Sequence, residues 1–148
     1  MTLMTAAFGA TDAGKTYRCT AKDAVSLQDD GTLGKDMTAE ESRKRLDGII
    51  IDTLTGALTY PGGRREIWHV VQKGNVNKDY VLLPPYLPKA EGYVLLPPFL
   101  PKAVNPHEAA KTGATNFIRV RDWSSDPRVK FMVFELSILV TGTCEVVR

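Results

Sequence analysis

The chain has 148 residues, of which 43% are hydrophobic and 24% are charged, a composition typical of a globular domain rather than of a disordered chain. Its 19 basic and 17 acidic residues nearly balance, so the charge points neither to a nucleic acid nor to an anionic membrane as partner. No apolar run approaches the ~20 residues that a membrane-spanning helix needs. We therefore expect one soluble domain, residues 16–148, that binds no nucleic acid and does not span a membrane.

Residues 1–15 are rich in Ala, Thr and Gly, and they predict a flexible leader. They lack the basic start and the long apolar segment of a secretory signal. The compartment stays unknown from the sequence: cytoplasmic by default, or exported if a signal has been removed.

The first strand is predicted at residues 17–27, where aromatic and β-branched residues mix with polar ones, and a turn rich in Asp and Gly follows it. One short helix comes next. Thr38 and Glu41 have the spacing of a capping box, and residues 39–46 are good helix formers. We expect this helix to lie on the surface with Leu46 touching the core.

Short β-branched and aromatic runs continue the chain, and they predict strands at residues 49–51, 57–60, 66–72 and 80–83. The first two are joined by a tight turn, in which Asp52 accepts backbone amides and Gly56 takes a positive φ. Alternation within the third predicts two faces, with Trp68 and Val70 on one and with Ile67, His69 and Val71 on the other.

Further strands are predicted at residues 117–121, 129–140 and 144–147. About seven or eight short strands, without helices between successive strands, indicate an antiparallel sheet. The fold class is therefore mainly β, an antiparallel barrel or sandwich with one short surface helix. A long proline-rich arm, residues 84–116, interrupts it.

The arm contains a tandem duplication, because residues 80–90 recur at residues 93–103 with only Tyr86 exchanged for Phe99. The repeat is too short, and its copies are too few, for a solenoid. Proline has no amide to donate, so each copy predicts a four-residue Tyr-Val-Leu-Leu strand followed by a polyproline-like segment. Only one copy can keep the original place in the sheet, and the other is expected outside it or at an edge.

The arm is unusually apolar. Its candidate partner-binding residues are Leu83, Tyr86, Leu87, Leu96, Phe99 and Leu100. So many apolar side chains are rarely left in water. Three alternatives follow: the arm covers the core of its own domain, it packs against a second copy to form a homodimer, or it binds another protein or lipid.

Two cysteines, Cys19 and Cys144, lie near opposite ends of the domain. If the first and last strands are neighbours, a disulfide can join them. Two separate buried thiols are the alternative, and the sequence favours it.

The chain offers few groups for catalysis, since it has only two histidines. His69 lies among apolar neighbours and fits a sheet-face position, and His107 fits the start of a solvated helical turn. We expect neither to be catalytic, and a hydrolase that uses His107 is a disfavoured alternative. The closely spaced ligand pairs of zinc sites are missing, so no metal and no cofactor is expected.

Residues 9–16 have the Gly-x-x-x-x-Gly-Lys-Thr spacing of the Walker A motif, and over these eight residues the chain resembles P-loop nucleotide-binding proteins. The resemblance implies that Lys15 and Thr16 contact phosphate and magnesium. Such a loop needs a strand before it and a helix after it. Residues 17–27 predict a strand instead, so we interpret the match as accidental.

A second group of residues has the chemistry of a ligand site, and its members are Trp68, Tyr80, Trp123, Arg119 and Arg121. Arg119 and Arg121 share one face of a strand, where they can pair with a carboxylate or stack on a base. Structural salt bridges to Glu135 or Glu145 are the alternative, and we favour them.

The sequence therefore favours a binding role over catalysis. The leading hypothesis is a domain that binds a partner, or itself, through the duplicated arm. The second is a small apolar-ligand carrier, since a closed barrel of about eight strands can hold one small ligand.

Overall fold

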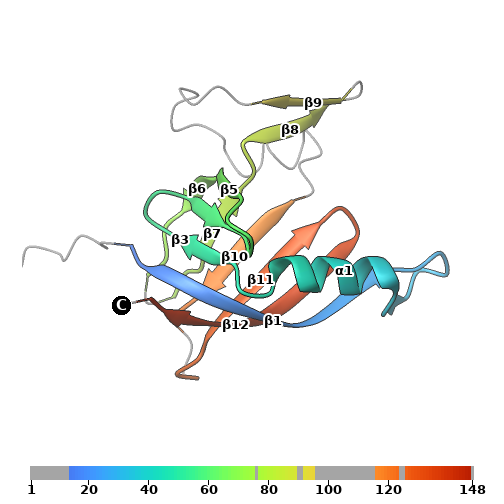
Figure 1. Cartoon of the computed structure of the whole chain (residues 1–148), viewed down its shortest axis with the longest axis horizontal. Helices are drawn as coiled ribbons and strands as arrows, with labels where there is room; N and C mark the ends of the chain where they lie inside the picture. The colour runs from blue at the N-terminus through green and yellow to red at the C-terminus, as the bar shows by residue number, and fades with distance from the viewer. Residues whose placement is uncertain (1–13, 76, 90–91, 96–115, 124–125, 148) are drawn as a thin grey trace, which may run out of the picture.

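The computed structural model describes residues 14–75, 77–89, 92–95, 116–123 and 126–147 (Figure 1). Its helix within these ranges is α1 (Met37–Leu46). Its strands are β1 (Thr16–Leu27), β2 (Leu33–Gly34), β3 (Ile50–Asp52), β4 (Ala57–Thr59), β5 (Arg65–Ile67), β6 (His69–Gln72), β7 (Tyr80–Leu83), β8 (Tyr86–Lys89), β9 (Gly92–Leu95), β10 (Phe117–Arg121), β11 (Val129–Glu135) and β12 (Ile138–Val146).

Ten of the strands form one antiparallel sheet, ordered β5-β4-β3-β1-β12-β11-β10-β7-β6, with β2 paired to β1 beside this path. The strands at the two ends of that order, β5 and β6, are consecutive in the chain and are separated only by Trp68. The sheet is therefore a nearly closed barrel. This confirms the predicted mainly antiparallel β fold with one helix, although the strands outnumber the seven or eight expected.

Two predicted strands are each divided in two. Residues 66–72 break at Trp68, whose amide donates to the carbonyl of Gly56 at 2.9 Å, one position beyond the Ala57–Ile67 pair of the β4–β5 ladder. Residues 129–140 break at Leu136, which adopts a left-handed φ of 53° between β11 and β12. Neither break could be predicted, because the sequence stays apolar through both positions. A buried corner and a tight turn can contain the same residue types as a strand.

The turn between β3 and β4 is as predicted. Asp52 Oδ1 accepts the amides of Leu54 and Thr55 at 2.9 and 3.0 Å, and Gly56 has a φ of +77°. A Cβ atom at Gly56 would lie 1.9 Å from the carbonyl oxygen of Trp68. The absence of a side chain at Gly56 thus lets the corner at Trp68 approach the turn.

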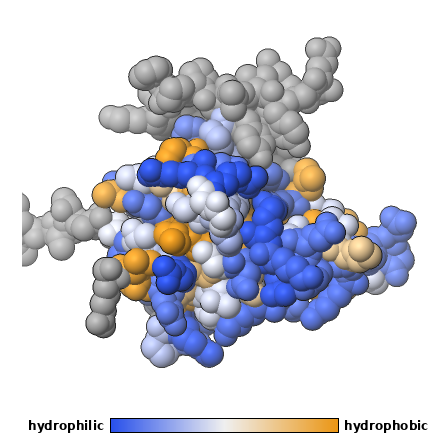
Figure 2. All heavy atoms as spheres, in the orientation of Figure 1, coloured by the Kyte–Doolittle hydropathy of each residue, from blue (hydrophilic) through white to orange (hydrophobic). Residues whose placement is uncertain are grey.

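Helix α1 begins differently from the predicted capping box. Its N-cap is Asp36, whose Oδ1 accepts the amide of Ala39 at 2.7 Å, and Thr38 lies inside the helix. An aspartate at the N-cap satisfies the same free amides as a threonine, so Asp36 fills the role that was expected of Thr38. Leu46 lies in the core as expected, and Ala39 joins it there. Figure 2 shows mainly hydrophilic residues over the exposed side of α1.

The barrel interior is filled by side chains from both halves of the chain. Its largest fully buried members are Tyr17, Tyr80, Leu46, Ile49, Ile51, Leu58, Leu82, Ile118, Val120, Val133, Val140 and Thr53. Alternate residues of each strand point into this core, and the residues between them point outward.

The first and last strands are neighbours, and they are covalently joined. Cys19 and Cys144 face each other in the β1–β12 register and form a disulfide. The favoured prediction of two separate thiols is therefore wrong. It failed because a sequence separation of 125 residues says nothing about distance in a sheet that closes on itself.

The duplicated segment is divided between two sheets. The first Tyr-Val-Leu-Leu copy is β7, paired with β6 and β10 in the barrel. The second copy contributes to β9, which pairs with β8 in a separate two-stranded sheet (Figure 1). One copy thus keeps the barrel position and the other is displaced, as expected. Residues 86–89 form a strand rather than a polyproline-like segment, since Pro88 of β8 lies opposite Tyr93 of β9.

Candidate functional site

The outer face of β10 carries two arginines. Ile118 and Val120 are fully buried in the core, and alternation therefore turns Arg119 and Arg121 outward. Their side chains are 43% and 45% exposed. The sequence predicts this pair on one face of a strand, and the structure confirms that arrangement.

Both arginines pair with a buried carboxylate, that of Asp79. Arg121 donates to it through two nitrogens, Nε to Oδ1 at 3.0 Å and Nη2 to Oδ2 at 3.2 Å. Arg119 Nη2 lies 3.2 Å from Oδ2, and Trp123 Nε1 donates to Oδ1 at 2.7 Å. The side chain of Asp79 is only 4% exposed, so this cluster is fixed at its acidic centre.

The expected salt bridges to Glu135 or Glu145 are not the ones that form. Glu135 pairs with Arg45 of α1 instead. Asp79 immediately precedes β7, and Val81 of β7 lies opposite Arg119, so the register brings the aspartate beside Arg121. Asp79 could not be predicted from the sequence as their partner, because it lies about 40 residues away from the arginines along the chain.

The pKa of Asp79 lies below its ordinary value. Burial by itself raises it, but the hydrogen bonds from Arg121 and Trp123 and the charges of Arg121 and Arg119 outweigh that effect. Asp79 is therefore ionised at neutral pH and holds the two arginines in place.

A groove of about 410 Å³ opens beside this cluster, over β10, β11, β12 and the bulge of β1. Its polar lining is Lys22, Asp79, Arg119, Arg121, Lys130, Thr141 and Thr143. Its apolar lining is Phe131, Met132 and Gly142. The groove has the volume of a small-molecule site and combines an apolar floor with a few charged groups, as such sites commonly do.

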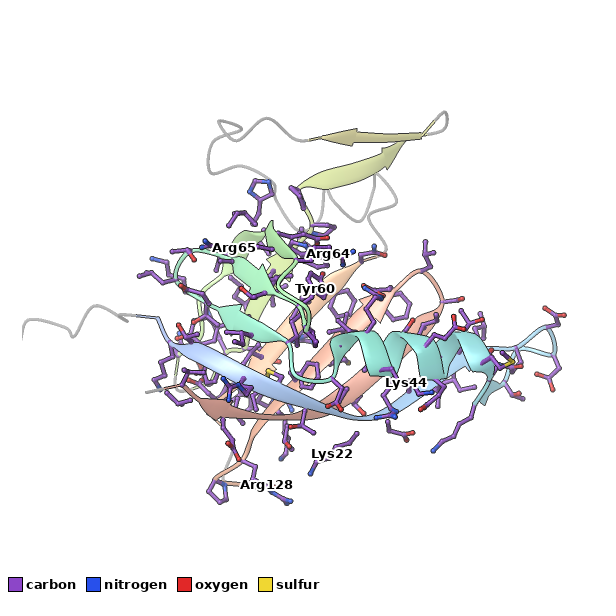
Figure 3. The ribbon with its side chains drawn as sticks, in the orientation of Figure 1. Lys22, Lys44, Tyr60, Arg64, Arg65 and Arg128 are labelled. Carbon is purple, nitrogen blue, oxygen red and sulfur yellow. A yellow bond between two sulfur atoms is a disulfide. The ribbon has the colours of Figure 1, made fainter. Side chains whose placement is uncertain are left out.

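Cationic groups dominate the groove, because four basic side chains face one carboxylate. Lys130 also lies 3.6 Å from Asp126, whereas Lys22 has no ion pair with any residue that the structure describes. Arg119 Nε is buried and lacks a hydrogen-bond partner within the same part of the chain. Figure 3 shows Lys22 on the side of β1 and β12 opposite to α1. Lys22 and the exposed parts of the two arginines therefore leave positive charge available for an anion.

The predicted ligand-binding residues are divided between the inside and the outside of the barrel. Trp68 and Tyr80 are buried in the core, with exposed fractions of 3% and 2%. Trp123 is 39% exposed and packs against Arg121, whose guanidinium carbon lies 5.1 Å from the ring centre. The structure thus brings Arg119, Arg121 and Trp123 together and places the other two elsewhere.

Trp68 belongs to a second polar cluster, at the β4–β5 hairpin. Glu66 Oε2 accepts from the hydroxyl of Tyr60 at 3.1 Å and from Trp68 Nε1 at 3.0 Å. Arg64 lies over the Tyr60 ring at 4.2 Å and pairs with Glu66 at 3.4 Å (Figure 3). Each of these polar groups is already engaged, so we interpret this cluster as structural.

The remaining predicted residues add no further candidate site within the described part of the chain. Leu83 is buried on β7. Tyr86 and Leu87 form part of strand β8. The other predicted residues lie outside the described ranges: Leu96, Phe99, Leu100 and His107. His69 is half-buried on β6, and its Nε2 has no hydrogen-bond partner in the described part of the chain.

The segment with Walker A spacing does not lead into a helix. Thr16 starts strand β1, and Lys15 Nζ lies 3.3 Å from Asp122. The amide of Lys15 donates to Thr53 Oγ1, so residue 15 is attached to the barrel, while residues 1–13 of the predicted leader lie outside the described ranges. A strand at this point lacks the helix N-terminus that a P-loop uses to bind phosphate.

Among the described residues, no group of three or more His, Cys, Asp or Glu side chains is placed to hold a metal ion. The helix in the same ranges is too short and too polar to cross a membrane. No family model matches the chain, and no significant similarity was found to a curated protein or to a solved structure. The groove beside Asp79 is therefore the feature from which a function can be inferred.

Proposed function

We propose that this protein is a binding domain that holds a small organic anion in the groove on the outer face of β10, β11 and β12. The observation that carries the proposal is the charge of the groove: four basic side chains line it, and the carboxylates facing them are Asp79 within the groove and Asp126 beside Lys130. A carboxylate or phosphate group fits these donors, because guanidinium and ammonium groups form charge-assisted hydrogen bonds with such oxygens.

The site is prepared before a ligand arrives. Asp79 fixes both arginines through the contacts described above, so little side-chain entropy remains to be lost on binding. Thr141 and Thr143 of β12 add hydroxyl groups that can orient an anion. Trp123 stands beside Arg121 and gives the site an intrinsic fluorescent reporter.

Titration of the whole protein with acetate, benzoate and inorganic phosphate, followed by Trp123 fluorescence and by calorimetry, tests the proposal. We expect saturable binding of at least one anion, weakened by added salt because the attraction is between charges. Absence of saturable binding of all three anions at millimolar concentration would overturn it.

Two lysines provide a matched pair of variants. Lys22→Gln removes one positive charge from the groove, and Lys44→Gln removes the same charge from the exposed surface of α1 (Figure 3). We expect Lys22→Gln to weaken the anion about two- to tenfold, the equivalent of removing one partly exposed ion pair, and Lys44→Gln to leave the affinity unchanged. Equal effects of the two substitutions would place the anion outside the groove.

A second candidate function is self-association or partner binding through the duplicated arm. It is supported by the pairing of β8 with β9, which forms a separate sheet rather than an extension of the barrel. Deletion of residues 91–103 removes one copy of the repeat. Sedimentation of the full chain is expected to give a dimer, and the deleted chain a monomer. A monomer in both cases contradicts the self-association.

A further inference from the structure

The outer face of the barrel becomes apolar next to the groove. Four apolar residues on neighbouring strands lie side by side across the sheet. Phe117 of β10 lies opposite Phe134 of β11, and Phe134 also lies opposite Leu139 of β12. Leu139 in turn lies opposite Val25 of β1. All four are outward-facing positions and are half-buried. Outward positions on a solvated sheet are ordinarily polar, so an apolar row across four neighbouring strands is a departure from the expected pattern.

This apolar row runs parallel to the charged rows of the groove. Along β11 the outward residues are Lys130, then Met132, then Phe134. Met132, which lines the groove, thus stands between its cationic end and the aromatic pair. Phe134 lies four positions after Lys130 along the strand, a distance of about 13 Å. The rings of Phe117 and Phe134 are stacked, with their centres 5.6 Å apart, and together with Leu139 they form an apolar patch that we call the shelf.

We infer that the ligand of the groove is an amphipathic anion, a single molecule with a carboxylate head and an apolar chain. This inference rests on the proposed anion-binding function. The head pairs with Arg119, Arg121 and Lys130, and the chain extends over Met132 onto the shelf of Phe117 and Phe134. Charge complementarity sets the orientation of the bound ligand, because the cations lie toward one end of the groove and the apolar row lies beyond the other end.

A series of straight-chain carboxylates tests the inference: acetate, butanoate, hexanoate, octanoate and decanoate, each kept below its micelle concentration and measured by calorimetry on the whole protein. Each added methylene is expected to strengthen binding about two- to fourfold until the chain passes the shelf, because the shelf removes part of its surface from water. Equal affinity across the series overturns the inference and leaves the proposed anion site standing. Absence of binding by every member overturns the inference, and it overturns the proposed function as well if benzoate and phosphate also fail to bind.

The shelf itself is tested by Phe134→Thr and by Leu139→Thr, which keep a strand-forming residue while removing apolar surface. Ile67→Thr is the matched control, since Ile67 is also an outward apolar strand residue, 53% exposed on β5 and away from the groove. We expect either shelf variant to reduce the gain per methylene while acetate binds as before, which also shows that the variant is folded. An unchanged gain in both shelf variants overturns the assignment.

A membrane surface would present the same carboxylate or phosphate chemistry. Flotation with vesicles of phosphatidylcholine and phosphatidylserine distinguishes it from a single ligand molecule. We expect the protein to stay unbound to vesicles while it binds decanoate. Vesicle binding that decanoate does not compete away overturns the inference in favour of a membrane surface.

Discussion

The Cα atoms of Cys19 and Cys144 lie 3.9 Å apart, and their side chains form a disulfide between the first and the last strand of the barrel. The backbone amide and carbonyl of Cys19 are directed to the other side, where they bond to Ile49 and Gly48. Cys19 and Cys144 are thus a non-hydrogen-bonded pair of the β1–β12 ladder, the closest kind of cross-strand approach. The disulfide therefore holds strands β1 and β12 together.

Reduction of this disulfide is expected to destabilise the fold. The disulfide closes a loop of more than a hundred residues, and the entropy that this loop closure removes from the unfolded chain corresponds to about 3–5 kcal/mol of stabilisation. Urea denaturation with and without a phosphine reductant measures the effect. The double variant Cys19→Ala, Cys144→Ala should show the lower stability under both conditions. A wild-type stability that does not respond to the reductant would contradict the bond.

Asp79→Asn is expected to lower the free energy of unfolding at pH 7 by about 1–2 kcal/mol, because it weakens charged hydrogen bonds to two half-exposed arginines. The folded-state pKa of Asp79 is depressed, so its contribution is present above the ordinary value of 3.8 and is lost as pH falls through the folded pKa. The difference between wild type and variant should therefore shrink below about pH 4. Other carboxylates titrate equally in both proteins, so a difference that stays constant down to pH 2 would count against this role.

Gly56→Ala should be much more damaging than Gly62→Ala. Both glycines have positive φ, +77° and +91°, so either alanine costs about 1 kcal/mol of backbone strain. At Gly56 the new Cβ also meets the carbonyl of Trp68, whereas a Cβ at Gly62 would meet no other residue within 4 Å beyond its chain neighbours. We expect a loss of about 3 kcal/mol or more at Gly56. Equal thermal stabilities of the two variants would mean that the corner at Trp68 does not approach this turn.

Tyr60→Phe tests the cluster at the β4–β5 hairpin. Burial first, and the nearby charge of Glu66 second, raise the pKa of Tyr60 well above its ordinary value of 10.0. The hydroxyl therefore stabilises the fold fully below pH 10, by about 1 kcal/mol, and this contribution is lost as pH rises toward the folded pKa. Denaturation at pH 7 and at pH 11 measures it. A larger destabilisation by the substitution at pH 11 than at pH 7 is the contrary result.

The groove could be predicted only in part. Alternation put Arg119 and Arg121 on one face of a strand, and that holds because a strand's period of two is a local property of the backbone. Asp79, Lys22, Lys130 and Met132 were missed, since they come from other strands and loops, and only the pairing of those strands brings them beside the arginines. Trp68 and Tyr80 were predicted at a ligand site, yet their large side chains are used to fill the barrel interior.

The sequence by itself determined where most of the strands lie, the Asp52–Gly56 turn and the duplicated segment, because each depends on neighbours within a few residues. It also determined the class of fold, since short strands without intervening helices leave only antiparallel pairing. The tertiary structure decided the rest: the division of two strands at Trp68 and Leu136, the bond between Cys19 and Cys144, and the partner of the two arginines. Each of these depends on which strands become neighbours when the sheet curves and closes, and that register is set by the packing of the whole core.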